Sequence, residues 1–365
     1  MRAAEWGRLD RSDFRERWEA LSSRAAEPNP FFDSWHLMPA LRRLDPDGAC
    51  RLLCGEADGA LLWLLPVVRQ RRYYRWPLHN LASWLHANAF LGAPLVAKGY
   101  EAAFWRALFA WADANARAAL FVHLTQLPLG GPLDAALHAV CAEQGRKFAL
   151  VHREERAMLA SDHSPAAYFE AALSGKKRKE LRRQFARLSE LGTVAVERQT
   201  DAEGLESWTD AFLALERSGW KGAAGSAMGS HLATSDLFRE ALTGAAERNK
   251  LERLTLRLDG APIAMLATLL APPGAFAYKT AFDERFARFS PGVLLQRENL
   301  AVLANPAIAW SDSCASADHP MIDHVWRERR AIGRYSVAIG GPVRRGLFAA
   351  IAHAETRRNR AECVA

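Results

Sequence analysis

The sequence contains 365 residues, of which 50% are hydrophobic and 24% are charged. One hydrophobic core fills roughly 250–300 residues, so two domains are expected, and the composition excludes an intrinsically disordered or collagen-like chain. The formal net charge of +7, from 48 Lys and Arg residues against 41 Asp and Glu residues, indicates either an anionic partner or a solvated basic surface.

The sequence carries no sign of membrane insertion or secretion. Its apolar runs are shorter than the ~20 residues that span a bilayer, and its first residues are charged, unlike a signal peptide. The cysteines are odd in number and scattered, which is typical of a reduced cytoplasmic protein; they are Cys50, Cys54, Cys141, Cys314 and Cys363. We therefore expect a cytoplasmic protein.

The first half of the chain alternates helical and strand-like patterns from residue 31 to about residue 158. Apolar spacing and turn residues predict these elements: a helix over 35–44, strands over 51–54 and 61–68, a helix over 100–115, a strand over 120–124, a helix after residue 132 and a strand over 147–151.

The second half begins near Ser164-Pro165 and repeats this mixture. A first helix is expected to end at Gly192, as glycines often do at helix ends, and Asp259-Gly260 predicts a hairpin. The predicted elements that follow the first helix are a strand over 194–197, helices over 205–215 and 236–249, strands over 254–258, 263–270 and 275–281, a helix over 291–303, strands over 308–312 and 335–339, and a helical tail over 344–360.

Each half thus combines helices with a short, mostly antiparallel sheet, which predicts an α+β fold. The repeated element order is what a duplicated α+β unit would give. We expect an N-terminal domain over 1–158, a C-terminal domain over 159–343 and a helical tail over 344–365.

Three segments could carry chemistry. Ser290-Pro291 predicts a helix start just after a strand, where backbone N–H groups could hold a phosphate with help from Arg285 and Arg288. Trp220-Lys221 follows Gly219 in an expected loop that could shape a pocket, with Glu216 nearby as a candidate base. The alternatives are an ordinary strand–helix connection and solvated surface residues.

The third segment is a basic helix over 176–187. Lys176, Lys179, Arg183 and Arg187 share one helical face, whereas Leu181, Phe185 and Leu188 share the other. A cationic stripe of this kind could bind the phosphates of a nucleotide, of RNA or of anionic lipid. A solvated helix face is the alternative.

Other motifs are weak or absent. Asp318-His319 and Asp323-His324 lack further ligands at metal-binding spacing, so no metal is expected. The sequence contains no Walker loop, no GxSxG and no GxGxxG, which excludes P-loop hydrolysis, α/β-hydrolase chemistry and a standard dinucleotide fold.

Taken in chain order, these segments form a series that resembles the CelD-like (cellulose-biosynthesis-type) acyltransferases of the GNAT superfamily. Fem-type aminoacyltransferases share this architecture. The series consists of Ser174-Gly175-Lys176-Lys177-Arg178, Leu215-Glu216, Trp220-Lys221-Gly222, Asp259-Gly260 with Pro262-Ile263-Ala264, Tyr278-Lys279-Thr280-Ala281-Phe282-Asp283 and Ser290-Pro291-Gly292-x-Leu294-Leu295. The first half is similar in Pro30-Phe31-Phe32 with Trp35, and in Asp58-Gly59 followed by Leu64-Leu65-Pro66.

The resemblance implies tandem GNAT-like domains, with acyl-CoA bound as a co-substrate in the second and no tightly bound cofactor. The strand over 275–281 would contact the pantetheine arm. The phosphates would meet the helix start and nearby cations, namely Arg288, Ser290, Gly292, Val293, Leu294, Lys176 and Lys179.

The implied reaction is attack of an amine on an acyl thioester. Candidate bases are Asp283, Glu216 and Asp312, in that order, and Tyr278 is a candidate proton donor to the thiolate. Trp220, Lys221 and Lys279 are expected to contact the substrate or donor.

The chain departs from the family pattern in two places. Its phosphate segment has a single glycine, in Arg288-x-x-x-Gly292, and the Tyr-Lys pair that often follows the strand over 308–312 is absent. His319 or His324 could substitute for that lysine.

We therefore expect an N-acyltransferase that uses an acyl-CoA or acyl-carrier thioester and acts on the amine of a small molecule, amino sugar or peptide. One alternative is a Fem-like transferase that takes its acyl group from aminoacyl-tRNA, with RNA held by the basic helix. The other is a non-catalytic binding protein of an envelope-polysaccharide system.

Overall fold

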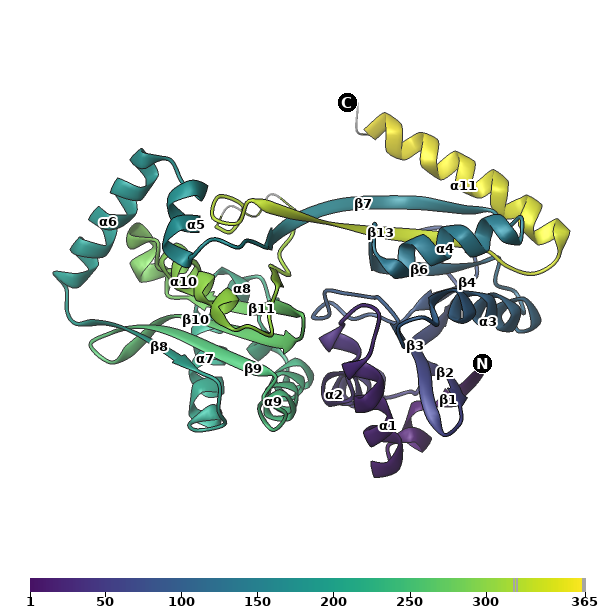
Figure 1. Cartoon of the computed structure of the whole chain (residues 1–365), viewed down its shortest axis with the longest axis horizontal. Helices are drawn as coiled ribbons and strands as arrows, with labels where there is room; N and C mark the ends of the chain where they lie inside the picture. Colours follow the sequence, from purple (N-terminus) through teal and green to yellow (C-terminus); the bar gives the residue numbers. More distant parts are fainter. Residues whose placement is uncertain (318, 320, 363–365) are drawn as a thin grey trace. The chain divides into compact units, whose positions relative to one another are not determined.

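The computed structural model describes residues 1–317, 319 and 321–362, with the side chains of 356–362 excepted. It divides the chain into two compact units (Figure 1). The first comprises residues 1–155 and 331–365, and the second comprises residues 156–330. The end of the first segment, at residue 155, lies close to the expected boundary at 158. The last strand was expected in the C-terminal domain over 159–343 and the tail as a separate segment over 344–365, whereas this division places both in the first unit.

The first unit is built on a mixed sheet in the order β1-β2-β3-β4-β6-β13, and among its described strand pairs only β4–β6 is parallel. The strands are β1 (Arg2–Glu5), β2 (Arg51–Ala57), β3 (Ala60–Gln70), β4 (Asn80–Ser83), β5 (Leu95–Val96), which pairs with β3, β6 (Phe121–Pro128) and β13 (Glu328–Ala338). The helices are α1 (Ser12–Ser23), α2 (Ser34–Leu44), α3 (Glu101–Ala114), α4 (Pro132–Glu143) and α11 (Pro342–Glu362).

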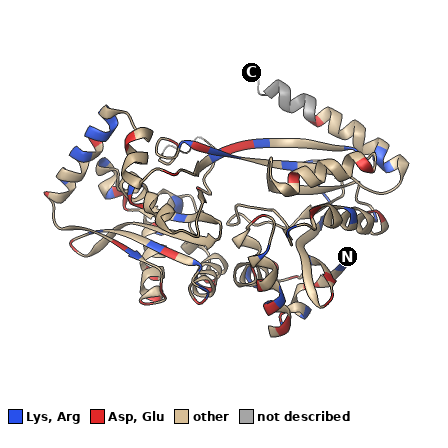
Figure 2. Ribbon diagram, in the orientation of Figure 1, with Lys and Arg blue, Asp and Glu red and all other residues tan. Residues whose placement is uncertain are grey.

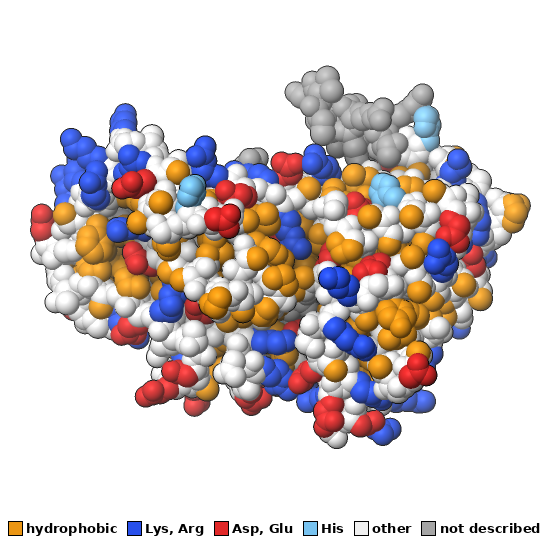
Figure 3. All heavy atoms as spheres, in the orientation of Figure 1, with side chains coloured by type: hydrophobic (Ala, Val, Ile, Leu, Met, Phe, Trp, Pro, Cys, Tyr) orange, Lys and Arg blue, Asp and Glu red, His pale blue; other side chains and the backbone are white. Residues whose placement is uncertain are grey.

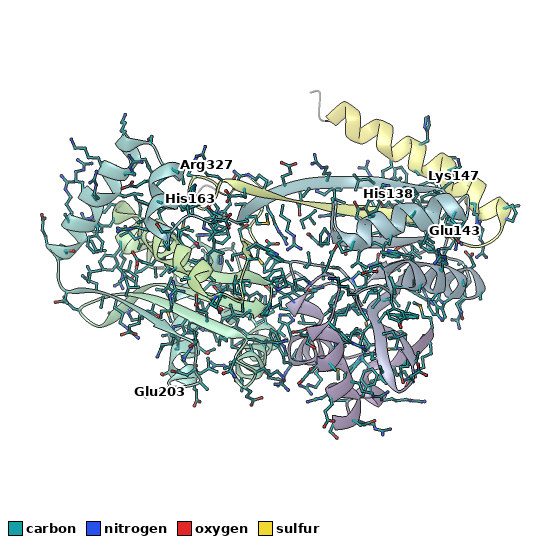
Figure 4. The ribbon with its side chains drawn as sticks, in the orientation of Figure 1. His138, Glu143, Lys147, His163, Glu203 and Arg327 are labelled. Carbon is teal, nitrogen blue, oxygen red and sulfur yellow. The ribbon has the colours of Figure 1, made fainter. Side chains whose placement is uncertain are left out.

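Packing explains why the end of the chain joins this unit. The strand β13 is antiparallel to β6, with Val337 opposite Val122. The hydroxyl of Tyr335 on β13 lies 3.0 Å from Nε2 of His138 on α4, which is labelled in Figure 4. Phe348 of α11 is buried against Phe121. The strand pairing, the Tyr335–His138 contact and the Phe121–Phe348 contact join residues about 200 positions apart and fix the C-terminal segment to the first sheet.

The second unit has a sheet in the order β7-β12-β11-β10-β9-β8. Its strands are the C-terminal part of β7 (Phe148–Leu159), β8 (Val194–Gln199), β9 (Leu251–Leu258), β10 (Ala261–Ala271), β11 (Gly274–Phe282) and β12 (Trp310–Asp312). Of the strand pairs that the structure describes in this unit, only β11–β12 is parallel. Its helices are α5 (Pro165–Ala172), α6 (Gly175–Ser189), α7 (Leu205–Ser218), α8 (Trp220–Ala223), α9 (Leu232–Ala246) and α10 (Pro291–Asn299).

The alternation of β9 side chains produces the two layers of helices around this sheet. Leu254, Leu256 and Leu258 lie in a core with residues of α6 and α10, such as Leu188 and Leu294. On the opposite face, the indole N–H of Trp208 on α7 donates to the Thr255 hydroxyl at 2.8 Å. Figure 1 shows α5, α6 and α10 on one side of the strands, and α7 and α9 on the other.

The predicted α+β class is confirmed, with helices flanking mixed sheets. Three local expectations were wrong. Gly192 does not adopt the left-handed C′ conformation, because α6 ends at Ser189, and a Cβ at position 192 would collide with the Asp259 carboxylate. Phe185 is 37% exposed rather than buried with Leu181. Trp220 and Lys221 form the short helix α8 instead of a loop.

The four cysteines in the described part of the chain are buried free thiols, and Cys363 lies outside it. Among the described residues, no helix combines the length and apolar character needed to span a membrane.

Candidate active site

The strands β11 and β12 separate soon after they meet. Their parallel pairing covers three residue pairs, from Gly274 opposite Trp310 to Phe276 opposite Asp312. The strand β11 continues to Phe282 against β10, so residues 277–282 have β10 as their partner on one side only in the described ladders. An unpaired strand edge of this kind presents backbone N–H and C=O groups that a ligand can use.

A β-bulge lies where the two strands separate. Ala277 faces Thr268 and Lys279 faces Ala267, so Tyr278 is an extra residue in β11 without an opposite residue in β10. Bulges interrupt the ladder and redirect side chains, and they are common next to active sites. The sequence does not reveal this bulge, because the apolar pattern of the strand continues through it.

Asp312 holds the chain where β12 turns away. Its carboxylate is fully buried and accepts from Arg156 at 2.7 Å, from Arg330 at 2.8 Å and from the Cys314 backbone N–H at 2.9 Å. Burial raises the pKa of Asp312, but the two guanidinium groups outweigh it and hold this pKa below its ordinary value. This geometry makes Asp312 a structural anchor and a poor proton acceptor.

Glu216 and Lys221 reach the open edge from α7 and α8. The Glu216 carboxylate is buried and accepts from Lys221 Nζ at 2.9 Å and from the Met228 backbone N–H at 2.8 Å. Lys221 Nζ also donates to the backbone carbonyl of Thr280 on β11, at 3.0 Å. A carboxylate and an ammonium are therefore positioned two residues from the bulge.

The electrostatics of this cluster depend on burial and on these two charges. Burial and the positive charge of Lys221 lower the pKa of Lys279 to about 8, with Glu216 opposing the shift. Burial and the negative charge of Glu216 raise the pKa of Tyr278, so its phenol stays protonated at neutral pH. Burial and Lys221 lower the pKa of His319, and burial with Asp312 raises the pKa of the Cys314 thiol.

The N-terminus of α10 is the predicted phosphate site. Ser290 adopts the left-handed conformation (φ 53°) and its side chain does not cap the helix. Its backbone carbonyl accepts the N–H groups of Val293 and Leu294, both at 3.0 Å. Gly292 lies against the Met321 thioether so closely that a Cβ would collide with Sδ. A phosphate that approaches on this side of Gly292 would therefore require the flexible Met321 side chain to move.

Asp283 is engaged in a local turn. Its carboxylate accepts the Arg285 backbone N–H at 3.0 Å and forms a bidentate pair with the Arg285 guanidinium, at 2.6 and 3.0 Å. Hydrogen bonding to Arg285 holds the pKa of Asp283 below its ordinary value despite partial burial. Arg288, in the same 3₁₀ segment (Glu284–Phe289), is exposed and stacks on the Phe289 ring at 4.7 Å.

The basic helix α6 carries its cations on the surface. Lys176 and Lys179 line a shallow hollow formed entirely by residues 174–183. A second hollow includes Arg178 and Arg182 with Arg297 and Glu298, near the C-terminal end of α10 rather than its N-terminus. Figure 2 shows the blue segments along α6, and Figure 3 shows basic side chains gathered over it.

The structure therefore brings four predicted site residues together, namely Glu216, Lys221, Tyr278 and Lys279. Trp220 is 59% exposed, and its backbone N–H donates to Glu284 Oε1 at 2.7 Å. Sequence reasoning missed Cys314 as part of the cluster and suggested His319 only as a possible substitute for a lysine.

Among the described residues, no group of three His, Cys, Asp or Glu side chains is placed to hold a metal ion. Of the weak metal motifs, Asp318 lies outside the described residues and His324 is exposed.

Comparison with known proteins agrees with this geometry. Residues 175–319 match the acetyltransferase (GNAT) domain family. This match lies within the second unit and covers less than half of the chain. The matched segment contains the bulge, the open edge of β11, and the Glu216–Lys221 pair. No curated protein sequence matches the chain significantly.

Solved structures share the fold of the whole chain at low sequence identity. A crystal structure of FemX is 12% identical, with a TM-score of 0.56, and the match covers 93% of this chain and 98% of that one. The C-terminal domain (DUF2156) of a putative lysylphosphatidylglycerol synthetase from Agrobacterium fabrum is 14% identical, with a TM-score of 0.53 and coverages of 94% and 95%. These likenesses establish a common fold.

Proposed function

We propose that the second unit is an N-acyltransferase that moves an acyl group from an acyl-CoA or acyl-carrier thioester to an amine of a small molecule, amino sugar or peptide. The observation that carries this proposal is the open edge of β11 after Phe276, with a bulge at Tyr278 and a buried carboxylate beside it. The pantetheine arm would lie along residues 277–281, as an added strand pairs with an open edge. A CelD-like relationship is part of the same proposal.

In the proposed reaction, the bulge and the ionic pair have separate roles. We assign polarisation of the thioester carbonyl to the backbone N–H of Tyr278, because this residue forms the bulge beside the open edge of β11. Glu216 accepts a proton from the substrate ammonium, and the neutral amine attacks the carbonyl carbon. The C–N bond forms and the C–S bond breaks. The departing thiolate takes a proton from the Tyr278 phenol, which regains one from the nitrogen of the tetrahedral intermediate, so the products are an amide and a thiol. Lys221 keeps Glu216 oriented.

The donor phosphates would lie near the N-terminus of α10, with Arg288 as a side-chain contact and Lys279 closer to the reacting end. Asp283 and Asp312 remain untested as bases. Their arginine partners favour Glu216 over both, because a carboxylate with a lowered pKa is a weaker proton acceptor.

The direct test is intact-mass screening of the full chain with a set of acyl-CoAs and pooled amines. Acyl transfer should yield an amine product whose mass increases by that of the acyl group. If no acyl-CoA yields a product and coenzyme A does not bind, the thioester proposal fails.

Aminoacyl-tRNA is the second candidate donor. Two observations favour this donor. The exposed cations of α6 could bind RNA, which associates with cationic surfaces. The Met321 side chain lies against Gly292, one of the residues expected to meet the CoA phosphates. Competition by tRNA but not by coenzyme A, with steep weakening of donor binding at higher salt, would select this candidate.

The pH dependence of donor binding tests Lys279. Its pKa of about 8 means that Lys279 is mostly charged at pH 7 and mostly neutral at pH 9. If it contacts an anionic group of the donor, the Kd for coenzyme A should rise by about an order of magnitude across this interval. The Lys279→Arg variant keeps its charge, so its Kd should stay nearly constant. Equal pH dependence in both proteins would remove Lys279 from the donor site.

Met321 offers a test of the phosphate position. The Met321→Ala variant should bind coenzyme A several-fold more tightly than the native protein, because the thioether no longer has to leave Gly292. Isothermal titration calorimetry measures the change, with Met38→Ala as a control that alters a buried methionine of α2 in the first unit. An unchanged or weaker affinity in Met321→Ala would place the phosphates away from Gly292.

A further inference from the structure

A cavity of about 750 Å³ lies in the first unit, apart from the acyltransferase residues of the second. Its walls come from β1, the 3₁₀ helix at Trp6–Leu9, the start of α1, strands β2, β3 and β4, and the C-terminal end of α3 with the turn that follows. Nothing in the proposed function uses these residues. A cavity of this volume is in the range that holds a nucleotide-sized ligand.

Arginine dominates the lining of this cavity. The seven arginines that line it are Arg2, Arg8, Arg11, Arg17, Arg51, Arg69 and Arg117. The carboxylates that pair with them are Glu5 and Asp13 in the lining and Glu56 behind it. Seven guanidinium groups against three carboxylates leave a surplus of four positive charges, which a multiply charged anion would balance.

Arg69 and Arg117 account for half of this surplus. In the part of the chain that the structure describes, no carboxylate forms an ion pair with either of them. Arg69 donates to the backbone carbonyls of Asn115 at 2.6 Å and Ala116 at 3.4 Å, which holds it beside the turn that contains Arg117. Burial and the charge of Arg117 lower the pKa of Arg69, as expected for two close cations without a counterion.

Apolar side chains share the lining of the cavity with these arginines. Leu9, Phe14, Val67 and Leu81 contribute to it, and Trp111 of α3 lies one helical turn before Asn115. Arginine forks match phosphate oxygens, and an indole accepts a planar or apolar group by stacking. The cavity thus offers both cationic and apolar groups to one ligand.

We propose that this cavity binds an organic polyphosphate, a molecule with two or more linked phosphates and a planar or apolar organic part. Arg69 and Arg117 contact the phosphates, and Trp111 contacts the organic part. An inorganic anion would leave the apolar groups unused. A nucleic acid strand would need an extended cationic track, whereas these arginines surround a single hollow.

Calorimetric titration of the full chain with ATP as the probe tests this proposal. Binding should weaken steeply between 50 and 200 mM salt, because the contacts are ionic. The Arg69→Ala/Arg117→Ala variant should bind ATP at least about tenfold more weakly than the native protein. The matched control, Arg71→Ala/Arg72→Ala, removes the same charge from exposed residues outside the cavity and should bind ATP normally.

Two further measurements separate the two kinds of contact in the cavity. Inorganic tripolyphosphate should bind several-fold more weakly than ATP. The Trp111→Leu substitution should weaken the binding of ATP and leave the affinity for tripolyphosphate unchanged. The proposal is overturned if the native protein does not bind ATP at 50 mM salt, or if tripolyphosphate binds as tightly as ATP. It is also overturned if the two double variants lose affinity for ATP to the same extent. If ATP binds in the acyl-donor site instead, the Arg69→Ala/Arg117→Ala variant should have the same affinity for ATP as the native protein. This result would also overturn the proposal. Thermal unfolding of each variant confirms that it is folded.

Discussion

Replacement of Glu216 by glutamine is expected to lower kcat/KM for acyl transfer by about 10²- to 10⁴-fold, the usual contribution of a positioned general base. Glutamine preserves the shape of the side chain and can still accept the Met228 backbone N–H, but it cannot take a proton from the substrate. Steady-state kinetics with the acyl donor found by mass screening would measure the loss. Donor binding should change little, since Glu216 is assigned to the amine.

The control for this variant is Asp283→Asn, which changes the first of the three candidate bases suggested by the sequence. Because Asp283 is paired with Arg285 and caps a 3₁₀ turn, its replacement should change kcat/KM by only a few-fold. A severe loss in Asp283→Asn together with near-normal activity in Glu216→Gln would reverse the assignment. The Glu216→Gln substitution also removes the carboxylate that pairs with Lys221, which could destabilise the fold. Thermal unfolding measures this loss of stability separately from the loss of activity.

Replacement of Asp312 by alanine should destabilise the second unit by about 3–5 kcal/mol. The substitution leaves the guanidinium groups of Arg156 and Arg330 without their shared carboxylate, and Arg156 is almost fully buried. It also removes the hydrogen bond that turns the chain at Cys314, away from β11. Hydrogen exchange of amides in residues 156–330, followed at increasing urea concentration, would measure the loss.

The matched control is Asp210→Ala, which breaks an exposed ion pair with Arg239 and should cost less than about 1 kcal/mol. Because the folded-state pKa of Asp312 is lowered, its contribution is complete at neutral pH and declines as pH falls below the ordinary value of 3.8. Equal stability of the Asp312→Ala and Asp210→Ala proteins at pH 7 would contradict a structural role for Asp312.

Local patterns predicted most elements of the fold correctly. The Asp259-Gly260 hairpin forms between β9 and β10, with both turn residues at positive φ, and α10 begins at Pro291. The sequence did not predict β1, α1, β4, β5 or α5, and it predicted only the C-terminal end of β13. Several of these are short or polar segments, and β1 and β13 depend on pairing with distant strands, which a local pattern cannot show.

The candidate site was predictable in composition but not in geometry. Glu216, Lys221, Tyr278 and Lys279 were identified from segments that resemble a family. Their arrangement depends on a register shift between β10 and β11 and on the end of the β11–β12 pairing. The arginine partners that favour structural roles for Asp283 and Asp312 differ in their distance from the aspartate along the chain. Arg285 is two residues from Asp283, whereas Arg156 is distant from Asp312 in the sequence.

The most direct test of the central claim is a crystal structure of the full chain with a non-transferable acyl-CoA analogue. The analogue should lie along residues 277–281 of β11, with its carbonyl oxygen accepting from the Tyr278 backbone N–H and its phosphates near the start of α10. An analogue bound elsewhere, or a β12 that pairs with β11 beyond Phe276 and closes this edge, would contradict the assignment.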